Sequence, residues 1–282
     1  MKFAWIAATL LAVSPAALLA ADGTFDKTVH VSGGASLSVG TGSGYIHVSP
    51  GSDGQIHIIG HVHANHNWGS WGGSPEEAVK QVVDNPPIEQ DGNSVSVGKH
   101  TNYHNISIDY DITAPRGTEL DAGSGSGDLQ LRDLEGPLKA NTGSGSIEAI
   151  GFTGRVVLGT GSGDIHAELR GTPDVKAETG SGSIRLSGVN GALYAETGSG
   201  DIEIAGNPST NWKLETGSGS VSIDTAGHAK FSLDASTGSG SIHSDPPIST
   251  HGSLERHHIT GDINGGGPVV RIETGSGDIR IR

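Results

Sequence analysis

The sequence predicts an all-β protein, a β-solenoid (β-helix) formed by a single chain whose short strands coil into stacked rungs. Two observations support this fold class: a glycine-rich phrase recurs at a nearly constant interval, and the residues between its copies alternate between apolar and polar. Glycine is abundant, at 46 of 282 residues, yet it recurs in register with β-branched residues. This pattern favours an ordered repeat over a flexible linker.

The recurring phrase is Ser/Thr-Gly-Ser-Gly, followed in all but the first copy by Asp or Ser. Its copies begin at Thr41, Ser124, Thr142, Thr160, Thr179, Thr197, Thr216, Thr237 and Thr274. From Ser124 to Thr237 the steps are 18, 18, 19, 18, 19 and 21 residues. A degenerate copy, Gly261-Asp262-Ile263, fills the longer gap before Thr274. A period of this length is the signature of a stacked architecture.

One unit, residues 164–179, indicates which element the repeat builds. Ile165, Ala167 and Leu169 alternate with polar neighbours, and Val175 resumes the pattern after a Gly-Thr-Pro turn. Alternation with a period of two is the strand pattern. Each unit therefore predicts two short strands and two turns, with one rung per 18–19 residues. A single rung cannot bury its apolar face alone, so rungs must stack at the ~4.8 Å interstrand spacing.

The glycines of the phrase have a predicted structural role, because a sharp turn between strands needs a positive φ that glycine adopts without strain. The predicted turn glycines are Gly143, Gly145, Gly161, Gly163, Gly180, Gly182, Gly198, Gly200, Gly217 and Gly219. The threonine of each phrase is expected to face inward, where its hydroxyl can hydrogen-bond within the ladder.

Three segments divide the chain: residues 1–21, a less regular β region at 22–117, and the regular repeats at 118–282. In the middle segment, Ser74-Pro75-Glu76-Glu77 has the composition of a helix start, and prolines follow at 86 and 87. We expect a short helix near residues 75–84. It would cap the open end of the solenoid, because unpaired strand edges invite aggregation.

The other end of the predicted solenoid is the strand Ile279-Arg280-Ile281-Arg282. Two expectations remain open for it. Its outward arginines discourage pairing at the edge, or the edge associates end to end with another chain.

Residues 1–21 have the pattern of a secretory signal peptide, with Lys2, an apolar run and small residues before a polar start. A membrane anchor is the alternative. No later segment has the ~20 apolar residues that span a bilayer. We therefore expect the mature chain to be exported, to the periplasm, the cell envelope or the outside of the cell. The formal charge of −14 argues against nucleic acid as a partner, because phosphate binding needs a basic surface.

The chain resembles a bacterial family of β-strand-repeat proteins described as putative adhesins, whose function is otherwise unassigned. The resemblance rests on the repeated phrase, on ISIDYDITAPRGTELDAGSGSGDLQL at 106–131, and on the predicted helix followed by IEQDGNSVSV at 88–97. It covers most of the mature chain. It implies a β-solenoid in an exported or envelope protein with an adhesin-like binding or structural role, and a surface glycan or envelope protein as partner. It brings no catalytic residues to this sequence.

The segment HIIGHVHANHNWGSW breaks the repeat and supplies the candidate binding residues. They are His57, His61, His63 and His66 as metal ligands, and Trp68 and Trp71 as ligand-binding aromatics. Imidazoles two residues apart on a strand share a face and can bind Zn²⁺ or Cu²⁺. The alternative is a solvated strand face. Two tryptophans on a glycine-rich loop can stack on a sugar, and a packing anchor is the alternative there.

Other chemistry has weaker support in the sequence. Gly-x-Gly-Asp is similar to the phrase of calcium-binding β-rolls, but half of the copies carry serine at the aspartate position. We therefore expect no cofactor. The chain is predicted not to be an enzyme, because no nucleophile–base pair is visible and the aspartates are evenly spread.

A carbohydrate-active enzyme on a β-helix scaffold remains the alternative function, beside a metal-binding envelope protein. A surface groove with two carboxylates about 5–10 Å apart would favour the enzyme. The long loops near residues 207–211 and 245–258 are the expected places for a pocket.

The residue after each phrase gives a first testable prediction. It alternates along the regular repeats as Asp128, Ser146, Asp164, Ser183, Asp201 and Ser220. Aspartates on successive rungs would sit ~4.8 Å apart and repel, and interposed serines double that separation. Replacing Ser146, Ser183 and Ser220 with Asp should lower the melting temperature near neutral pH, measured by circular dichroism. An unchanged melting temperature would contradict charge spacing as the reason for the alternation.

Overall fold

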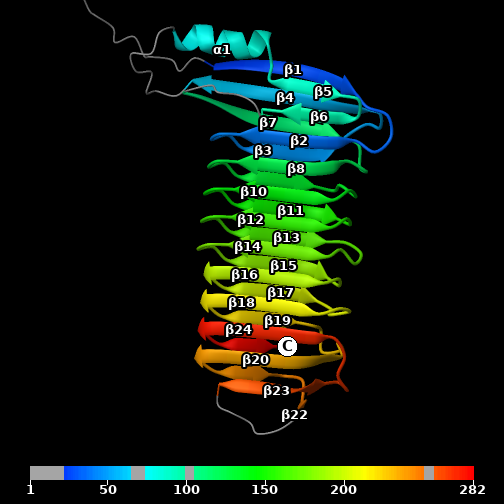
Figure 1. Ribbon diagram of the computed structural model, residues 1–282, viewed down its shortest axis with the longest axis vertical. Helices are drawn as coiled ribbons and strands as arrows, with labels where there is room; N and C mark the ends of the chain where they lie inside the picture. The colour runs from blue at the N-terminus through cyan, green and yellow to red at the C-terminus, as the bar shows by residue number, and fades with distance from the viewer. Residues whose placement is uncertain (1–21, 65–73, 99–104, 251–256) are drawn as a thin grey trace, which may run out of the picture.

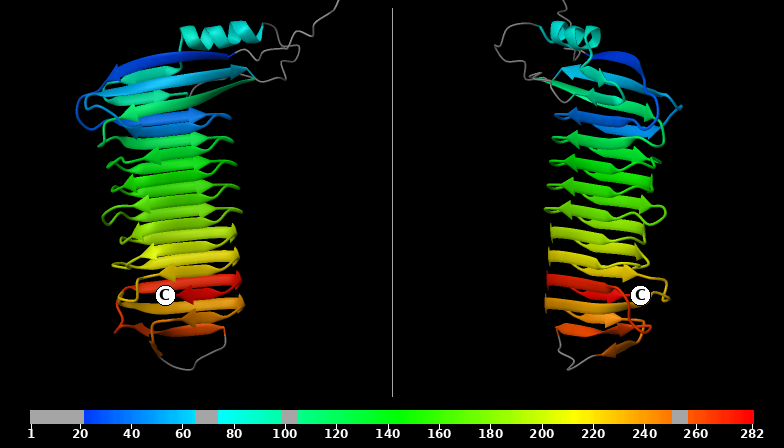
Figure 2. Two further views of the ribbon diagram at one scale, coloured as in Figure 1. Left: turned by 180° about the vertical axis from the view of Figure 1, so that it is seen from behind. Right: turned by 45° about the vertical axis from the view of Figure 1, so that its right-hand side comes forward.

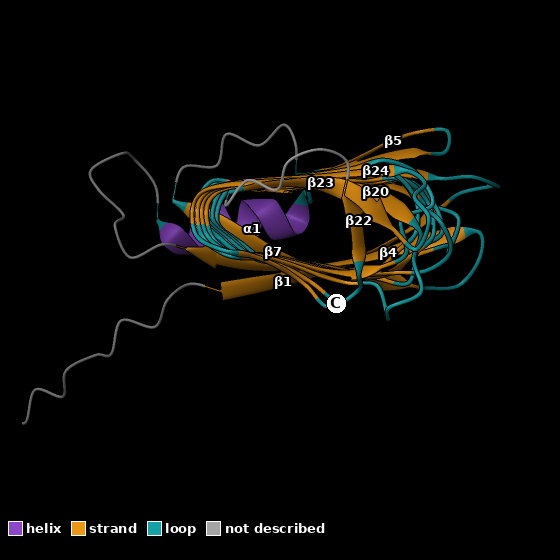
Figure 3. Cartoon of the chain, turned by 90° about the horizontal axis from the view of Figure 1, so that it is seen from below, coloured by secondary structure: helices purple, strands orange, loops and turns teal. Residues whose placement is uncertain are grey.

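The structure is a computed structural model that describes residues 22–64, 74–98, 105–250 and 257–282. These residues form 25 strands and one helix, stacked into a tall, narrow column (Figure 1). Two sheets face each other, and each regular rung contributes one strand to each sheet. Seen along the column, the two sheets form flattened layers joined by turns (Figure 3). The predicted β-solenoid is confirmed.

Sheet A has twelve strands and sheet B has thirteen. In spatial order sheet A contains β1 (Asp22–His30), β4 (Gln55–Ala64), β7 (Ile106–Ala114), β3 (Ile46–Pro50), β9 (Leu129–Arg132), β11 (Ile147–Phe152), β13 (Ile165–Leu169), β15 (Ile184–Val189), β17 (Ile202–Gly206), β19 (Val221–Asp224), β25 (Ile279–Ile281) and β21 (Ile242–Ser244). Sheet B contains β22 (Ile248–Thr250), β23 (His258–Ile263), β20 (Phe231–Ser239), β24 (Val269–Ser276), β18 (Trp212–Ser218), β16 (Leu193–Ser199), β14 (Val175–Thr179), β12 (Val156–Thr160), β10 (Leu138–Thr142), β8 (Glu119–Ser124), β2 (Ser36–Thr41), β6 (Ser94–Val97) and β5 (Ile88–Asp91).

The regular rungs pair in parallel and in register, so equivalent residues of successive units lie side by side. In sheet A, Ile147, Ile165, Ile184 and Ile202 form one inward row, and all four are buried. This in-register burial is what the period-two alternation predicts. Trp212 is also buried, and its indole N–H donates to the Gly191 carbonyl at 2.9 Å.

The N-terminal end of the column is closed by antiparallel strands and the helix α1 (Pro75–Asp84). Strand β4 pairs antiparallel with both β1 and β7, and α1 packs on β1 and β4 (Figure 1). The Ser74 hydroxyl accepts from the Glu77 N–H at 3.1 Å, the predicted capping interaction. Val79 and Val82 are buried against the strands.

Each corner of sheet B is held by the hydroxyl of the repeat threonine. Thr179 donates to the carbonyl of Gly163, in the preceding rung, at 2.9 Å and accepts from the N–H of Gly182, in its own turn, at 3.2 Å. The donated bond to the neighbouring rung recurs at Ser124, Thr142, Thr160, Thr197, Thr216, Thr237 and Thr274. These side chains are buried. At Ser124, Thr142, Thr160 and Thr179 the hydroxyl also accepts from its own turn, so it satisfies polar groups of two rungs away from water.

The ten predicted turn glycines serve close approach, not positive φ. None of the ten predicted turn glycines in residues 143–219 has a φ in the left-handed region. Instead, a Cβ placed on Gly163 would lie 1.9 Å from the carbonyl oxygen of Gly145 in the neighbouring rung. The positive-φ explanation is therefore wrong at these ten positions, where glycine is required because the turns of successive rungs stack backbone on backbone; Gly240 and Gly277, in the last two copies, do have a positive φ.

The aspartate of each phrase reaches across to the next rung. The carboxylate of Asp164 accepts from the N–H of Ser183 at 2.8 Å, and Asp128 and Asp201 do the same for Ser146 and Ser220. The serine position therefore donates a hydrogen bond to the aspartate before it. Because the donor is a main-chain N–H that any residue would supply, these bonds join successive rungs but do not by themselves explain the alternation.

The last segment of the chain does not lie at the end of the column. Strand β24 lies between β18 and β20, and β25 lies between β19 and β21. Figures 1 and 2 show this red rung inserted between the yellow and orange rungs. The corner contacts follow the spatial order, because Thr274 donates to Gly219 and Thr237 donates to Gly277.

Two sequence expectations are corrected by this insertion. The C-terminal strands are paired on both sides, so end-to-end association through the edge of the last strand is wrong. The degenerate copy at residues 261–263 is not a rung, because it lies in β23, which runs antiparallel to β20. The outermost strands at this end are β21 and β22, with three residues each.

The corner hydrogen bond can be tested at Thr179. Thr179→Val keeps the shape but leaves the Gly163 carbonyl and the Gly182 N–H buried without this partner, at an expected cost of about 1–3 kcal/mol of unfolding free energy. Thr179→Ser is the matched control, because Ser124 makes the same bond in the native column. Urea denaturation measures both variants. Equal stability losses in the two variants would contradict the role given to the hydroxyl.

A second test concerns the inserted rung. The pKa of Asp278 is lowered chiefly by the backbone N–H of Ser241 and then by the Ser241 hydroxyl, each at 2.8 Å. A carboxyl with a lowered folded-state pKa stabilises the fold above its usual value of 3.8, and that stabilisation is lost as pH falls through the folded-state pKa. The melting-temperature gap between wild type and Asp278→Asn should therefore be widest near neutral pH and shrink below that value. A melting-temperature gap that does not change with pH would contradict the stabilising hydrogen bonds between Ser241 and the Asp278 carboxylate.

Candidate functional site

Histidines and aspartates interleave on the outer face of sheet A at its N-terminal end. His57, His61 and His63 project outward from β4, between aspartates of β1 and β7. The nitrogen–oxygen pairs are His57–Asp26 at 2.7 Å, His61–Asp111 at 3.4 Å, His63–Asp22 at 2.9 Å, His63–Asp109 at 3.2 Å and His47–Asp111 at 3.2 Å. The alternation of β4 therefore brings the three histidines to one face, as their spacing predicts.

This arrangement pairs each imidazole with a carboxylate instead of gathering the imidazoles around one point. Across the described residues, no group of three or more His, Asp or Glu side chains is arranged to hold a metal ion. The fourth candidate ligand, His66, and the two tryptophans, Trp68 and Trp71, lie outside the described residues. The predicted signal segment at 1–21 also lies outside them.

The outer face of sheet B carries two adjacent rows of polar side chains. One row is Lys176, Tyr194, Lys213 and Arg271, and the other is Glu178, Glu196, Glu215 and Glu273. Each glutamate bonds the side chain two residues before it, at 2.9, 2.5, 2.8 and 2.6 Å in that order. Lys176 and Lys213 also lie over the Tyr194 ring, 5.6 and 5.4 Å from its centroid.

The glutamate row affects the pKa of Tyr194 and lines a groove on the outer face of sheet B. The hydrogen bond from Tyr194 to Glu196, together with partial burial, raises the pKa of the phenol far above its usual value. A shallow groove of about 540 Å³ lies over Glu196, Glu215 and Glu273. It places carboxylates of successive rungs side by side.

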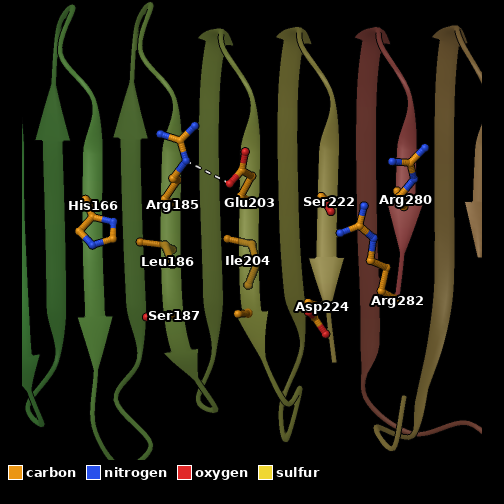
Figure 4. Close-up of a pocket in the computed structure, with 11 residues that line it drawn as sticks. His166, Arg185, Leu186, Ser187, Glu203, Ile204, Ser222, Asp224, Arg280 and Arg282 are labelled. Carbon is orange, nitrogen blue, oxygen red and sulfur yellow. Dashed lines mark hydrogen bonds and ion pairs between the residues drawn. The ribbon is translucent and has the colours of Figure 1, made fainter. Parts of the chain in front are cut away.

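A second groove, of about 530 Å³, crosses the outer face of sheet A over β13, β15, β17, β19 and β25. Short side chains at Ser187, Ala205 and Ser222 lie among longer charged ones (Figure 4). The charged and titratable lining residues are His166, Arg185, Glu203, Asp224, Arg280 and Arg282. The guanidinium of Arg185 donates to Glu203 at 3.0 Å, and this bond raises the pKa of Arg185. With three arginines and two carboxylates in its lining, the groove has a formal charge of +1 on this acidic chain, His166 being counted as neutral.

Sequence reasoning missed this groove. It expected a pocket at the loops near 207–211 and 245–258, whereas the groove lies on a flat sheet face. The outward positions of Arg185 and Arg280 follow from the alternation, but their proximity depends on the inserted rung. One signal pointed to the insertion: Ser220 and Ser241 are successive in the chain, which breaks the Asp/Ser alternation, and Asp278 restores it in space.

The described part of the chain contains no helix with the length and apolar character needed to cross a bilayer.

Comparison with protein families gives one decisive match. The model of the Toastrack family, DUF4097, matches residues 88–282. The chain belongs to the Toastrack family. This confirms the resemblance to adhesin-like β-strand-repeat proteins of unassigned function. No curated protein matches this Toastrack chain.

Two solved structures are similar to this Toastrack chain over most of its length. A putative adhesin from Bacteroides fragilis NCTC 9343 has 15% identity and a TM-score of 0.46, with 92% of this chain and 97% of that one covered. A putative cell adhesion protein from Clostridium sporogenes ATCC 15579 has 16% identity and a TM-score of 0.26, with 92% and 98% covered. Similarities this low carry no argument about ligands.

Proposed function

We propose that this Toastrack chain is an exported, non-catalytic binding scaffold of the cell envelope, with an adhesin-like role toward a surface glycan or an envelope protein. The pattern of residues 1–21 supports export. The observation that carries the binding role is the in-register arrangement of outward side chains. Rows of charged and hydroxyl-bearing residues repeat at the rung spacing along both faces, and an extended polymer can contact many rungs at once.

A carbohydrate-active enzyme is the second candidate, and one observation favours it. The groove over Glu196, Glu215 and Glu273 aligns carboxylates from strands stacked at ~4.8 Å, a strand spacing close to the ~5–5.5 Å that separates the two carboxyl groups of retaining glycosidases. Against it, Glu215 and Glu273 are held in ion pairs by Lys213 and Arg271. The same pairing joins Lys176 to Glu178 outside the groove, so the pattern is that of a repeated structural ladder.

The two candidates make different predictions in one experiment. The intact chain, immobilised without a histidine tag, is incubated with a panel of envelope and extracellular glycans and proteins. We expect specific retention of at least one of them and no release of reducing sugar. A Trp68→Ala/Trp71→Ala variant tests the predicted aromatic platform, and heat-denatured protein is the background control.

Release of reducing sugar would contradict the non-catalytic proposal. Glu215→Gln and Glu273→Gln variants would then show whether the glutamate groove is responsible. Retention of nothing above background would contradict the binding role itself.

A further inference from the structure

The inserted C-terminal rung builds the groove on sheet A. Stacking in chain order would place His243 of β21 beside Ser222 of β19. Instead β25 occupies that position, with Val221 opposite Ile279 and Ser222 opposite Arg280. His243 is displaced one rung further, opposite Arg280 on its other side. The insertion therefore brings two arginines, Arg280 and Arg282, next to β19 on a face that already carries Arg185, one strand from the edge of sheet A.

The main chain at the end of β25 is held by hydrogen bonds, and its two arginine side chains form no ion pairs among the described residues. The main-chain oxygen of Arg282 accepts from the N–H of Thr225 at 2.9 Å and from its hydroxyl at 3.0 Å, which fixes the end of β25. Among the described residues, neither Arg280 nor Arg282 forms a side-chain ion pair within 4.0 Å, although Asp224 lines the same groove and Arg280 interacts electrostatically with Asp278. Arg185, by contrast, is paired with Glu203. Two guanidinium groups thus remain available on a chain of net charge −14.

The shape of the groove limits what it can bind. It is open along the sheet face, its volume of about 530 Å³ is within the range of ligand sites, and its charged side chains surround short ones. In Figure 4 the Arg282 guanidinium lies beside Ser222, Arg280 projects further along the same segment of chain, and Arg185 and Glu203 lie on the other side of Ser222. A guanidinium presents a planar fork that matches a carboxylate or sulfate. The serine hydroxyls beside it can bond sugar hydroxyls.

We propose that this groove binds the oxyanion groups of an acidic glycan, with Arg280 and Arg282 as the anion-binding residues. This inference rests on the proposed binding function and names the ligand class for one face. A linear acidic glycan passes along the open groove, its carboxylate or sulfate on the arginines and its hydroxyls on Ser187, Ser222 and Glu203.

The test measures binding of the full chain to three probes by isothermal titration calorimetry: polygalacturonate, dextran sulfate and neutral dextran. Polygalacturonate presents carboxylates, and the dextran pair differs only in sulfate. We expect binding of at least one acidic probe, weakened by added NaCl, and none to dextran. Arg280→Gln/Arg282→Gln should weaken that binding by about tenfold or more.

Matched variants separate the groove from general charge and from folding. Lys139→Gln/Lys230→Gln removes the same charge from exposed residues outside the groove and should change the Kd by no more than about twofold. Arg280→Lys/Arg282→Lys keeps the charge but not the fork, and should give an intermediate loss. Melting temperatures of all variants report whether the column stays folded.

Four outcomes would overturn the proposal: unchanged binding in the glutamine variant, an equal loss in the Lys139/Lys230 control, dextran binding as tight as the acidic probes, or no acidic probe bound. If the wild-type chain retains only neutral glycans or an envelope protein in the panel experiment, the acidic-glycan inference fails and the proposed function stands. If it retains nothing, both fail.

Discussion

The hydrogen bond from the corner threonine to the glycine carbonyl of the neighbouring rung is the contact on which the column depends. It forms inside the protein, where an unpaired carbonyl or N–H would cost free energy. It also requires the two turns to approach until no Cβ fits between them, since a Cβ on Gly163 would lie only 1.9 Å from the Gly145 carbonyl oxygen. The threonine hydroxyl bond and the closely stacked glycine turns therefore depend on each other, and the phrase recurs because each pair of neighbouring rungs is joined by the same corner contact.

The flat faces follow from this corner. Each rung stacks on its neighbour through the same corner contact, so the strands pair without register shifts over most of the column. The outward side chains of successive rungs therefore form straight rows. The rows have different chemistry. Sheet B carries glutamates bonded to lysine, arginine or tyrosine side chains on their own strands. The described part of sheet A carries interleaved histidines and aspartates at one end, and Arg280 and Arg282, which form no ion pairs among the described residues, near the other. A single repeated scaffold thereby presents distinct surfaces, and the interruptions of the repeat decide where they differ.

Local pattern predicts the elements well. The alternation around Ile165 and Val175 fixes which side chains are buried, and Ser74 to Glu77 predicts where the helix begins. Two features of the structure could not be predicted from the local sequence pattern. The reason for the glycines at positions such as Gly163 lies in the next rung and not in the turn itself. The order of the rungs depends on pairing between residues far apart in the chain, which periodicity does not encode. The groove depends on that order, because Arg280 meets Ser222 only through the insertion.

The most direct measurement is therefore of rung order. The chain has no cysteine, so one pair of cysteines at a time can be introduced on the outer face of sheet B. Each variant is treated with a bifunctional thiol reagent that bridges two neighbouring strands, which lie ~4.8 Å apart. Glu215→Cys/Glu273→Cys joins strands that are neighbours in the structure, whereas Glu215→Cys/Ser236→Cys joins strands that the inserted rung separates. We predict efficient intramolecular cross-linking of the first pair and little of the second. Efficient cross-linking of the second pair, with little of the first, would contradict the inserted rung and the cationic groove it builds.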